Sequence, residues 1–416
     1  VTAIVAGGEP ADEVAEEGEL VQVALDATPF YAEGGGQVGD RGVLRCEASG
    51  ALLEVTGCRK AGPGAYMHEA RLLRGALRVG DAVSAAVDAP FRRKVRANHT
   101  ATHLLQSALK AVVGDDISQA GSLVTDERLR FDFNCPRGLS DAEIEQVEDL
   151  INDWVADGTE LVATEMPIDE AKEKGAVAMF GEKYGATVRV VDVPGVSMEL
   201  CGGTHVANIA EIGGFKVVSE AGVASGVRRI EAVTGAGVVG LLRERDAVVR
   251  ELGASLKVAP QEIAERVGAM QKEAAAAAKE VAALKAELAT ARAASLAAQA
   301  VAGGAEGTSY VVAEVEGADG KSLASAAEGL REALGEGGAV VLASAVGGKV
   351  AFAANFGPQA VAAGAKAGAV VGATAKVCGG GGGGKPNVAQ AGGRDASKLP
   401  EALDTAREAI ATALAA

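Results

Sequence analysis

The spacing of apolar positions changes several times along this chain of 416 residues. In residues 1–90, short runs alternate apolar and polar positions between turn-forming glycines, as in "ELVQVALDATPFY" and "VSAAVDAP". An alternation with period two predicts strands, and a cluster such as "EGGGQVGDRG" predicts a turn. We therefore expect residues 1–90 to form a small β-barrel subdomain or a sandwich.

After this segment the apolar spacing becomes helical. The run "RRKVRANHTATHLLQSALKAVV", residues 92–113, places its apolar side chains on one helical face and stops before Gly114. A second amphipathic helix is expected after Ser140, which has Glu143 at the spacing of a capping box. The strand-like runs "ATVRVVDV" and "GFKVVSEAG" follow. Residues 91–236 are therefore expected to form a mixed α+β core.

The clearest periodic pattern lies in the third quarter of the chain. Apolar residues alternate there by four and three over about four heptads: Ile263, Val267, Met270, Ala274, Ala277, Val281, Leu284, Leu288 and Ala291. Pro260 stands where this helix would begin, and another amphipathic helix precedes it. We expect residues 237–302 to form a long antiparallel helical hairpin. Whether the hairpin is only a spacer or also contacts a partner stays open.

The last part of the chain, residues 303–416, alternates strand-like and helix-like segments, which predicts a small α/β domain. It contains six consecutive glycines, 379–384, followed by "KPNVAQAGG". A glycine run alone is often a linker, but its backbone N–H groups can also bind phosphate or ribose. The whole chain is thus expected to be an α+β protein of four segments.

The bulk composition limits the function classes. A net charge of −16 argues against a generic nucleic-acid-binding surface, although a local basic patch is still compatible with it. Five scattered cysteines argue against a disulfide framework and indicate the reducing cytoplasm. No apolar run approaches the ~20 residues of a membrane span. Because the first residue is valine, we expect the chain to be part of a longer protein.

Three of the four histidines and one cysteine occur as two pairs with the same spacing. His99 and His103 fall on one face of the expected helix, and Cys201 precedes His205 by four positions. Such a Cys/His₃ set suits tetrahedral Zn²⁺, so we expect one zinc ion per chain. Whether this zinc is structural or catalytic stays open. The glycines after Cys201 make it the ligand expected to be held most loosely. The fourth histidine, His68, is assigned a structural or surface role.

These motifs carry a family resemblance that covers essentially the whole chain. "RANHTATHLLQSAL" and "SMELCGGTHVANIAEIGGFKVVSEAGVASGVRRIEAVTG" resemble the editing domain of alanyl-tRNA synthetases. "LDATPFYAEGGGQVGDRG" resembles the barrel before that domain, and "GGGGGGKPNVAQAGG" resembles the C-terminal domain. Threonyl enzymes share the editing motifs, but the glycine-rich segment indicates the alanyl family. The resemblance implies that the large N-terminal half, which activates alanine with ATP and Mg²⁺, is absent from this chain.

The resemblance also implies an activity, the hydrolysis of mischarged Ser-tRNA(Ala) and Gly-tRNA(Ala). A pocket built for alanine cannot strongly reject serine or glycine, so a second site must hydrolyse the wrong esters. Thr28 matches the family's serine-sensing threonine, and Gln37 matches its glutamine near the scissile ester; these two are the expected catalytic residues. Gly34 stands where many relatives have serine, so no side-chain hydrogen bond is expected there. Zinc could orient the terminal ribose or polarise a water molecule, and we favour the orienting role.

The partner that the resemblance implies is tRNA(Ala), contacted at its 3′ acceptor end and its outer corner. The expected phosphate contacts are basic residues: Arg92, Arg93, Lys94, Arg228, Arg229, Lys385 and Arg394. A charge run of this kind is also often no more than a solvated helix start. The C-terminal region is a candidate homodimer interface. The alternative function left open is a non-catalytic tRNA-binding or dimerisation module with a structural zinc.

Overall fold

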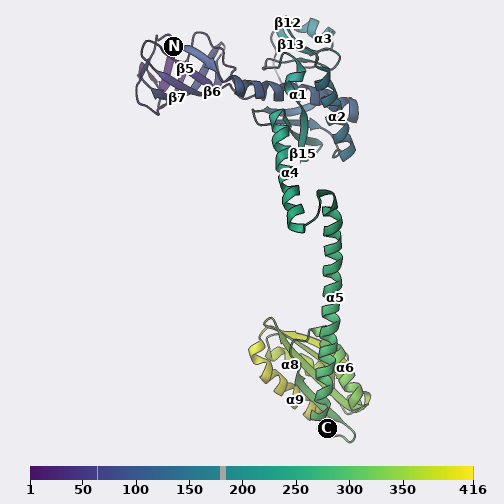
Figure 1. Ribbon diagram of the computed structural model, residues 1–416. Coiled ribbons are helices and arrows are strands. Elements are labelled where there is room, and N and C mark those ends of the chain that lie inside the picture. The colour runs from purple at the N-terminus through teal and green to yellow at the C-terminus, as the bar shows by residue number, and fades with distance from the viewer. Residues whose placement is uncertain (63, 179–183, 416) are drawn as a thin grey trace. The chain divides into compact units, whose positions relative to one another are not determined.

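The computed structural model describes residues 1–62, 64–178 and 184–415 (Figure 1). It divides into two compact units, Val1–Glu251 and Leu252–Ala416. Each unit combines helices with sheets, so the expected α+β class is confirmed. The finer division into four segments stays a prediction. No helix in the described part of the chain is both long and apolar enough to cross a membrane.

The first sheet of unit 1 is built by the segment in which strands were expected. Its seven strands lie in the order β2-β1-β4-β7-β6-β5-β9. Their bounds are β1 (Ala3–Ala6), β2 (Glu9–Ala11), β4 (Leu20–Ala24), β5 (Gly42–Arg45), β6 (Leu52–Gly62), β7 (Ala65–Arg74) and β9 (Ser84–Val87). A separate two-stranded ribbon pairs β3 (Glu13–Val14) with β8 (Leu77–Arg78).

This sheet corrects the expectation of a closed barrel. Among the described residues the ladder does not join β2 to β9, so the sheet is open with these two strands at its edges. Both edge strands are short, and short edges expose few unpaired backbone groups, so an open sheet can persist without closing on itself. The alternation in the sequence is the same for an open and a closed sheet, which is why it could not distinguish them.

Helix α1 (Ala89–Val113) follows this sheet and is the central element of the rest of unit 1. Asp88 caps its N-terminus by accepting a hydrogen bond from the Phe91 N–H, and Gly114 ends it. The helix is buried along most of its length, with Leu104 and other apolar residues in the largest core of the unit. A helix enclosed on several sides can hold polar side chains away from water, which prepares it for a buried site.

Two further sheets complete the unit around α1. One has the order β10-β11-β16-β15 and the other the order β12-β13-β14. Their bounds are β10 (Gln119–Val124), β11 (Leu129–Asn134), β12 (Val162–Pro167), β13 (Thr187–Val193), β14 (Ser197–Leu200), β15 (Phe215–Ala224) and β16 (Val227–Thr234). The remaining elements are α2 (Asp141–Asp157), α3 (Ile168–Glu173) and the short η1 (Ile209–Ile212). The predicted capping box of Ser140 and Glu143 is present at the start of α2.

The heptad pattern lies on a single long helix. Helix α4 (Ala236–Leu256) is followed by the turn η2 (Pro260–Glu262) and by α5 (Ile263–Ser295), so the predicted helix start at the proline is confirmed. Five of the apolar positions on α5 are 40–55% exposed: Val267, Met270, Val281, Leu284 and Leu288. They are therefore not part of the core of unit 2, whereas Ala289 near the end of the helix is buried there. The antiparallel hairpin stays a prediction.

Unit 2 contains a six-stranded sheet in the order β17-β18-β19-β20-β22-β21, with β18 and β19 parallel and the other neighbours antiparallel. The strands are β17 (Val301–Ala302), β18 (Ser309–Glu314), β19 (Gly338–Val346), β20 (Lys349–Phe356), β21 (Gly381–Gly384) and β22 (Val388–Gly393). The helical elements after α5 are η3 (Leu296–Gln299), α6 (Gly320–Leu334), α7 (Pro358–Ala362), α8 (Ala367–Val377), η4 (Ala396–Lys398) and α9 (Leu399–Ala415).

The glycine run is an edge strand of this sheet. A Cβ atom on Gly382 would lie 2.4 Å from the Cα and Cβ atoms of Ala391 on the neighbouring strand. A Cβ atom on Gly380 would lie 1.8 Å from the carbonyl oxygen of Gly392. Several glycines of the run are therefore required by close backbone approach, which a flexible linker would not need.

Candidate metal centre and adjoining pocket

The fold brings the two sequence pairs together. His99 and His103 lie one turn apart on α1, and Cys201 and His205 follow the end of β14. All four side chains are buried, and their possible ligand atoms lie within 4.8 Å of one another. The Cys201 Sγ atom is 3.5 Å from His99 Nε2 and 3.3 Å from His205 Nε2. Ligands of a tetrahedral zinc ion, bonded at roughly 2.0–2.3 Å, have similar mutual spacing.

Each histidine of the cluster has an oxygen partner on its Nδ1 side. His99 Nδ1 lies 2.6 Å from Gln37 Oε1, and His205 Nδ1 lies 3.1 Å from Thr100 Oγ1. His103 Nδ1 is 3.6 Å from a carboxylate oxygen of Glu199. Oxygen partners on Nδ1 fix the ring orientation and leave Nε2 as the metal-binding atom. The donor set and these outer partners fit zinc.

The electrostatics of the cluster favour neutral imidazoles. Burial, together with the neighbouring histidines and Arg189, lowers the pKa of His99 and of His205 well below the usual range. Burial and Arg189 lower the pKa of His103 to about 4. Neutral rings keep the nitrogen lone pairs that a metal needs. Burial also raises the pKa of Glu199, to about 7.

The loop after Cys201 is hydrogen-bonded to Arg189, and the expected looseness of Cys201 as a metal ligand stays a prediction. The Arg189 guanidinium donates to the carbonyl oxygens of Cys201 and Gly203 at 2.9 and 2.8 Å, and the Cys201 N–H donates to the Arg189 carbonyl. A Cβ atom on Gly203 would lie 2.1 Å from His99 Cε1, whereas one on Gly202 would meet nothing within 4 Å. Only Gly203 is therefore required by the packing of the cluster.

Gln37 connects the glycine turn of the first segment with this loop. It is fully buried, and its Oε1 atom also accepts from the Thr204 N–H at 2.9 Å. Its Nε2 atom donates to Thr204 Oγ1 at 2.9 Å. These contacts make Gln37 a positioning residue for His99. A direct contact of Gln37 with a substrate ester stays a prediction.

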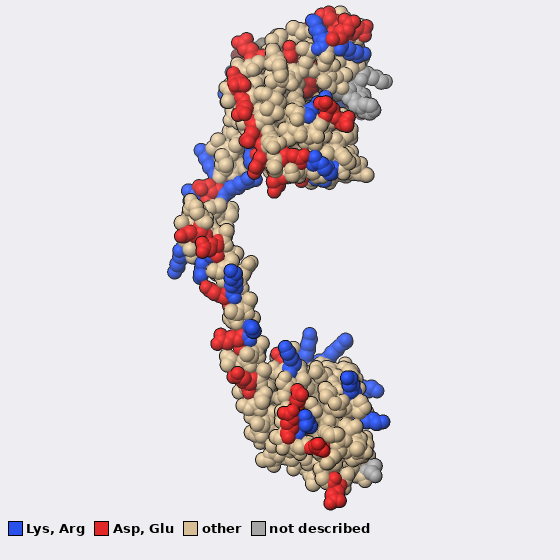
Figure 2. Space-filling view, turned by 90° about the vertical axis from the view of Figure 1, so that its right-hand side faces the viewer, with Lys and Arg blue, Asp and Glu red and all other residues tan. Residues whose placement is uncertain are grey.

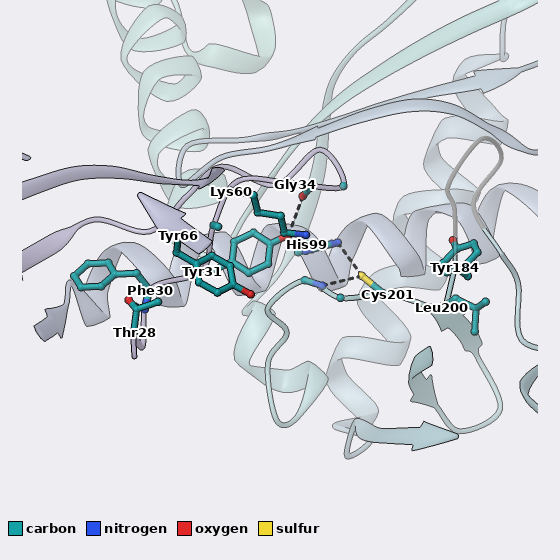
Figure 3. A pocket seen from close by; sticks show the side chains of 14 residues that line it. Thr28, Phe30, Tyr31, Gly34, Lys60, Tyr66, His99, Tyr184, Leu200 and Cys201 are labelled. Atoms are coloured by element: carbon teal, nitrogen blue, oxygen red, sulfur yellow. Dashed lines mark hydrogen bonds between the residues drawn. The ribbon is translucent and has the colours of Figure 1, made fainter. Parts of the chain in front are cut away.

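A cavity of about 350 Å³ adjoins the cluster (Figure 3). The cluster end is lined by residues that include His99 and Cys201, and the far end by Thr28 and Phe30. Gly34 also lines it, and its carbonyl accepts from Tyr31 Oη at 2.8 Å. Several other lining residues carried no signal in the sequence: Tyr31, Lys60, Tyr66, Tyr184 and Leu200. Thr28 and the metal cluster, 71 or more positions apart in the chain, thus face one cavity.

His68, assigned to structure or surface from the sequence, contacts Thr28. It is fully buried on β7, so the surface alternative is wrong. Its Nε2 atom lies 2.7 Å from Thr28 Oγ1. The alternation of β7 could have predicted that His68 is buried, because His68 lies on the same face of the strand as the buried Ala70 and Leu72. The contact with Thr28 left no sign in the sequence, since it joins residues 40 positions apart.

The predicted phosphate contacts in unit 1 fall into two groups. Three guanidinium groups are already engaged by carboxylates: Arg92 by Asp40, Arg228 by Glu220 and Arg229 by Asp132. Arg92 also donates to the Pro29 carbonyl at 2.6 Å, next to Thr28. By contrast, Arg93 and Lys94 line a second cavity, of about 460 Å³. Their roles in tRNA binding stay predictions.

The two basic residues predicted in unit 2 flank the glycine strand. Lys385 and Arg394 are exposed, one at each end of the β21–β22 hairpin. Figure 2 shows Lys and Arg side chains projecting from one side of this unit. On unit 1 the same view shows acidic and basic side chains interspersed. The arrangement is compatible with anion binding at unit 2, and that binding stays a prediction.

Three family models match separate parts of the chain. Residues 1–91 match tRNA synthetases class II (A), residues 188–231 match the threonyl and alanyl tRNA synthetase second additional domain, and residues 307–412 match the DHHA1 domain. The second of these matches contains Cys201 and His205. Two of these matches make separate parts of the chain similar to aminoacyl-tRNA synthetases, one of them to class II (A).

Curated relatives resemble the chain over its whole length. A probable alanine--tRNA ligase, chloroplastic/mitochondrial, of Ostreococcus tauri is 57% identical over 416 residues, which is 100% of this chain and 42% of that protein. An alanine--tRNA ligase of Synechococcus elongatus is 56% identical over 100% of this chain and 47% of its own length. This chain is similar over its whole length to alanine--tRNA ligases, and it spans less than half the length of these two relatives.

A solved structure also resembles part of the chain. It is the C-Ala domain from Aquifex aeolicus alanyl-tRNA synthetase, with 28% sequence identity and a TM-score of 0.24. The match covers 25% of this chain and 92% of that one.

The comparisons overturn one expectation. The chain was expected to lack the alanine-activating half, but residues 1–91 match the class II (A) synthetase family, and the relatives that match over the whole chain are alanine--tRNA ligases. The expectation that ATP and Mg²⁺ belong only to a missing half is wrong for the same reason. The strand pattern of residues 1–90 predicted only a β-barrel subdomain and gave no sign of the class II (A) match.

Proposed function

We propose that this chain is part of an enzyme that joins alanine to tRNA(Ala) with ATP, and that its buried cluster and pocket form a deacylase site. The proposed reaction of that site is the hydrolysis of the ester between a tRNA 3′ end and a wrong amino acid. One observation carries the proposal: a single cavity is lined at one end by His99 and Cys201 of the Cys/His₃ cluster and at the other by the half-buried Thr28. The similarity to alanine--tRNA ligases supports tRNA(Ala) as the partner.

The two ends of the cavity suit the two parts of an aminoacyl ester. A pocket end built from Thr28, Phe30 and Tyr66 is narrow enough to enclose a small amino-acid side chain, with one polar atom to recognise it. The other end, beside His99 and Cys201, would receive the terminal ribose. A bound zinc ion would supply a positive charge that orients ribose hydroxyls or polarises a water molecule.

Other residues of this chain would hold the zinc ligands in place. Gln37 fixes His99, Glu199 faces His103, and Arg189 fixes the loop that carries Cys201. Such outer contacts orient metal ligands and tune their basicity. The pairing of each ligand with an outer partner indicates a well-formed site. We favour zinc that orients the substrate, with hydrolysis by a water molecule that enters from the cavity.

The experiment compares two esters on the purified 416-residue chain. Ser-tRNA(Ala) and Ala-tRNA(Ala) are incubated with the intact chain and with a variant that carries His99→Ala and His103→Ala. We expect the intact chain to release serine faster than alanine, and the variant to lose both zinc and serine release. If the intact chain does not release serine above the uncatalysed rate, the deacylase proposal is wrong.

A second measurement separates loss of zinc from loss of fold. Circular dichroism and the zinc content of the double variant are recorded together. A variant that keeps its helices, binds no zinc and still hydrolyses Ser-tRNA(Ala) would show that the cluster does not serve the reaction.

A further inference from the structure

His68 lies at the far end of the cavity from the metal cluster, behind Thr28. It belongs to the interior of the first sheet, where its strand neighbours are Val23 on β4 and Cys58 on β6. The Phe30 ring packs edge-on against the imidazole, with the ring centroids 5.2 Å apart. The ring is fully buried, so bulk water cannot reach it to form a hydrogen bond. Both of its nitrogens are instead bonded within the protein.

The two partners of the ring determine where its proton lies. The Nδ1 atom is 2.9 Å from the carbonyl oxygen of Val23. A carbonyl can only accept a hydrogen bond, so Nδ1 must carry the proton. In a neutral imidazole the other nitrogen, Nε2, is then an acceptor. Burial lowers the pKa of His68, which keeps the ring neutral near pH 7.

The proton position in His68 in turn determines the direction of the Thr28 hydroxyl. Because Nε2 of His68 is an acceptor, the 2.7 Å contact requires Thr28 to donate its only hydroxyl proton to it. One lone pair of Thr28 Oγ1 accepts from the Phe30 N–H at 3.1 Å. The second lone pair remains for the cavity that Thr28 lines. Thr28 thus presents an acceptor to a ligand and has no proton to donate.

We infer that His68 is a positioning residue that makes Thr28 an obligatory hydrogen-bond acceptor, so that the site selects aminoacyl esters whose side chain donates a hydrogen bond from the β position. This inference rests on the proposed deacylase function. The favoured substrates are esters of small hydroxy amino acids. A methyl group in place of the hydroxyl leaves the second lone pair of the half-buried Thr28 oxygen unpaired, and an unmade hydrogen bond of this kind is costly.

The selectivity test uses two esters of nearly equal size. Serine and 2-aminobutyrate differ only by a hydroxyl or a methyl group on the β carbon. We expect the intact chain to hydrolyse seryl-tRNA(Ala) faster than 2-aminobutyryl-tRNA(Ala), and the ratio of their kcat/KM values to fall roughly tenfold in His68→Phe, the size of one neutral hydrogen bond. His68→Gln can donate to Val23 and accept from Thr28, so it should recover most of the ratio.

A double-mutant comparison shows whether His68 acts through Thr28. Thr28→Val removes the acceptor, so His68→Phe on that background should change the ratio of the two esters no further. If His68→Phe leaves the ratio unchanged while Thr28→Val lowers it, the inference is wrong. Independent, additive losses in the two variants would also overturn it.

The position of the proton can be measured without any substrate. Long-range ¹H–¹⁵N spectra of histidine-labelled protein distinguish the two neutral tautomers, and His68→Phe identifies the His68 signals by their loss. We expect a protonated Nδ1 and a bare Nε2. A protonated Nε2 would overturn the inference even if the chain hydrolyses Ser-tRNA(Ala). Conversely, absent hydrolysis with the expected tautomer contradicts the proposed function and leaves Thr28 an acceptor as inferred.

Discussion

The two ends of the cavity use histidine in the same way for different purposes. At both ends an oxygen atom bonds to Nδ1 and so determines what Nε2 can do. In the metal cluster the bonded oxygens come from the side chains of Gln37 and Thr100, and the Nε2 atoms of His99 and His205 converge on the Cys201 sulfur. At the far end the oxygen is the Val23 carbonyl, and one Nε2 atom faces one hydroxyl.

The two ends differ in the source of the oxygen on Nδ1, which is a side chain at the cluster and the backbone at His68. Side-chain oxygens such as that of Thr100 can be replaced by mutation, so the basicity of the metal ligands can be adjusted one at a time. A backbone carbonyl cannot be removed by a side-chain change, so the tautomer of His68 is as permanent as the sheet that contains it. We conclude that the cluster is the adjustable end of the cavity and the Thr28 end is the fixed one.

The largest effect is expected at the cluster, where a single added methyl group should break it. Gly203→Ala would place Cβ 2.1 Å from His99 Cε1 and 2.9 Å from Gln37 Oε1, so the ring must move out of position. We expect zinc affinity to fall about 100-fold or more, measured by chelator competition. Gly202→Ala, which meets nothing within 4 Å, is the matched control and should keep its zinc. Equal zinc affinity in the two variants would show that the loop moves to accommodate the added methyl group, and it would contradict the prediction.

The cluster was also the part of the site that the sequence revealed best. Two pairs of ligands with equal spacing are a local pattern, and only their meeting in space had to be supplied by the fold. The partners on Nδ1 were not detectable, because Gln37 lies 62 positions from His99 and contacts it only through tertiary packing. His68 was missed for a related reason, since a lone histidine on a strand looks like any other inward-facing residue.

The fold was predictable where residues that are close together in the sequence decide the outcome. The end of α1 at Gly114 and the cap of α2 at Ser140 depend on neighbouring residues, and both were predicted. Whether the first sheet closes depends on whether its two edge strands, β2 and β9, pair with each other. The sequence did not predict this correctly. The hydrogen bond from Arg189 to the loop at Cys201 could not be predicted either, because Arg189 lies on another strand.

An intermediate effect is expected at Gln37, which belongs to the same segment as Thr28 but serves the cluster. Gln37→Leu removes the acceptor from His99 Nδ1 and from the Thr204 N–H, so the ring loses its fixed orientation. Zinc affinity should fall roughly tenfold. Gln37→Glu keeps an oxygen at that position and should retain most of the affinity. If both variants bind zinc like the intact chain, the Nδ1 contact does not matter, and the parallel between the two ends fails.

The smallest effect concerns the charge state of His68. It tests whether the ring stays neutral, with its proton on Nδ1. Burial lowers the pKa of His68 below its ordinary value of 6.5. As pH falls through that value, the unfolded chain takes up a proton that the folded chain refuses, so this histidine lowers the free energy of unfolding until pH reaches the folded pKa. Above pH 6.5 both states are neutral, and the effect disappears.

The measurement is the difference in unfolding free energy between the intact chain and His68→Phe, followed by denaturant titration from about pH 8 to about pH 5. Taking the difference cancels the other three histidines, which both proteins share. We expect the difference to shrink as pH falls, because only the intact chain has the unfavourable proton uptake. Thr28→Val keeps His68 and should retain the pH dependence of the intact chain. A difference that is independent of pH would mean that His68 accepts a proton as readily in the fold as in the unfolded chain, and the Val23 carbonyl could then not keep its Nε2 atom bare for Thr28.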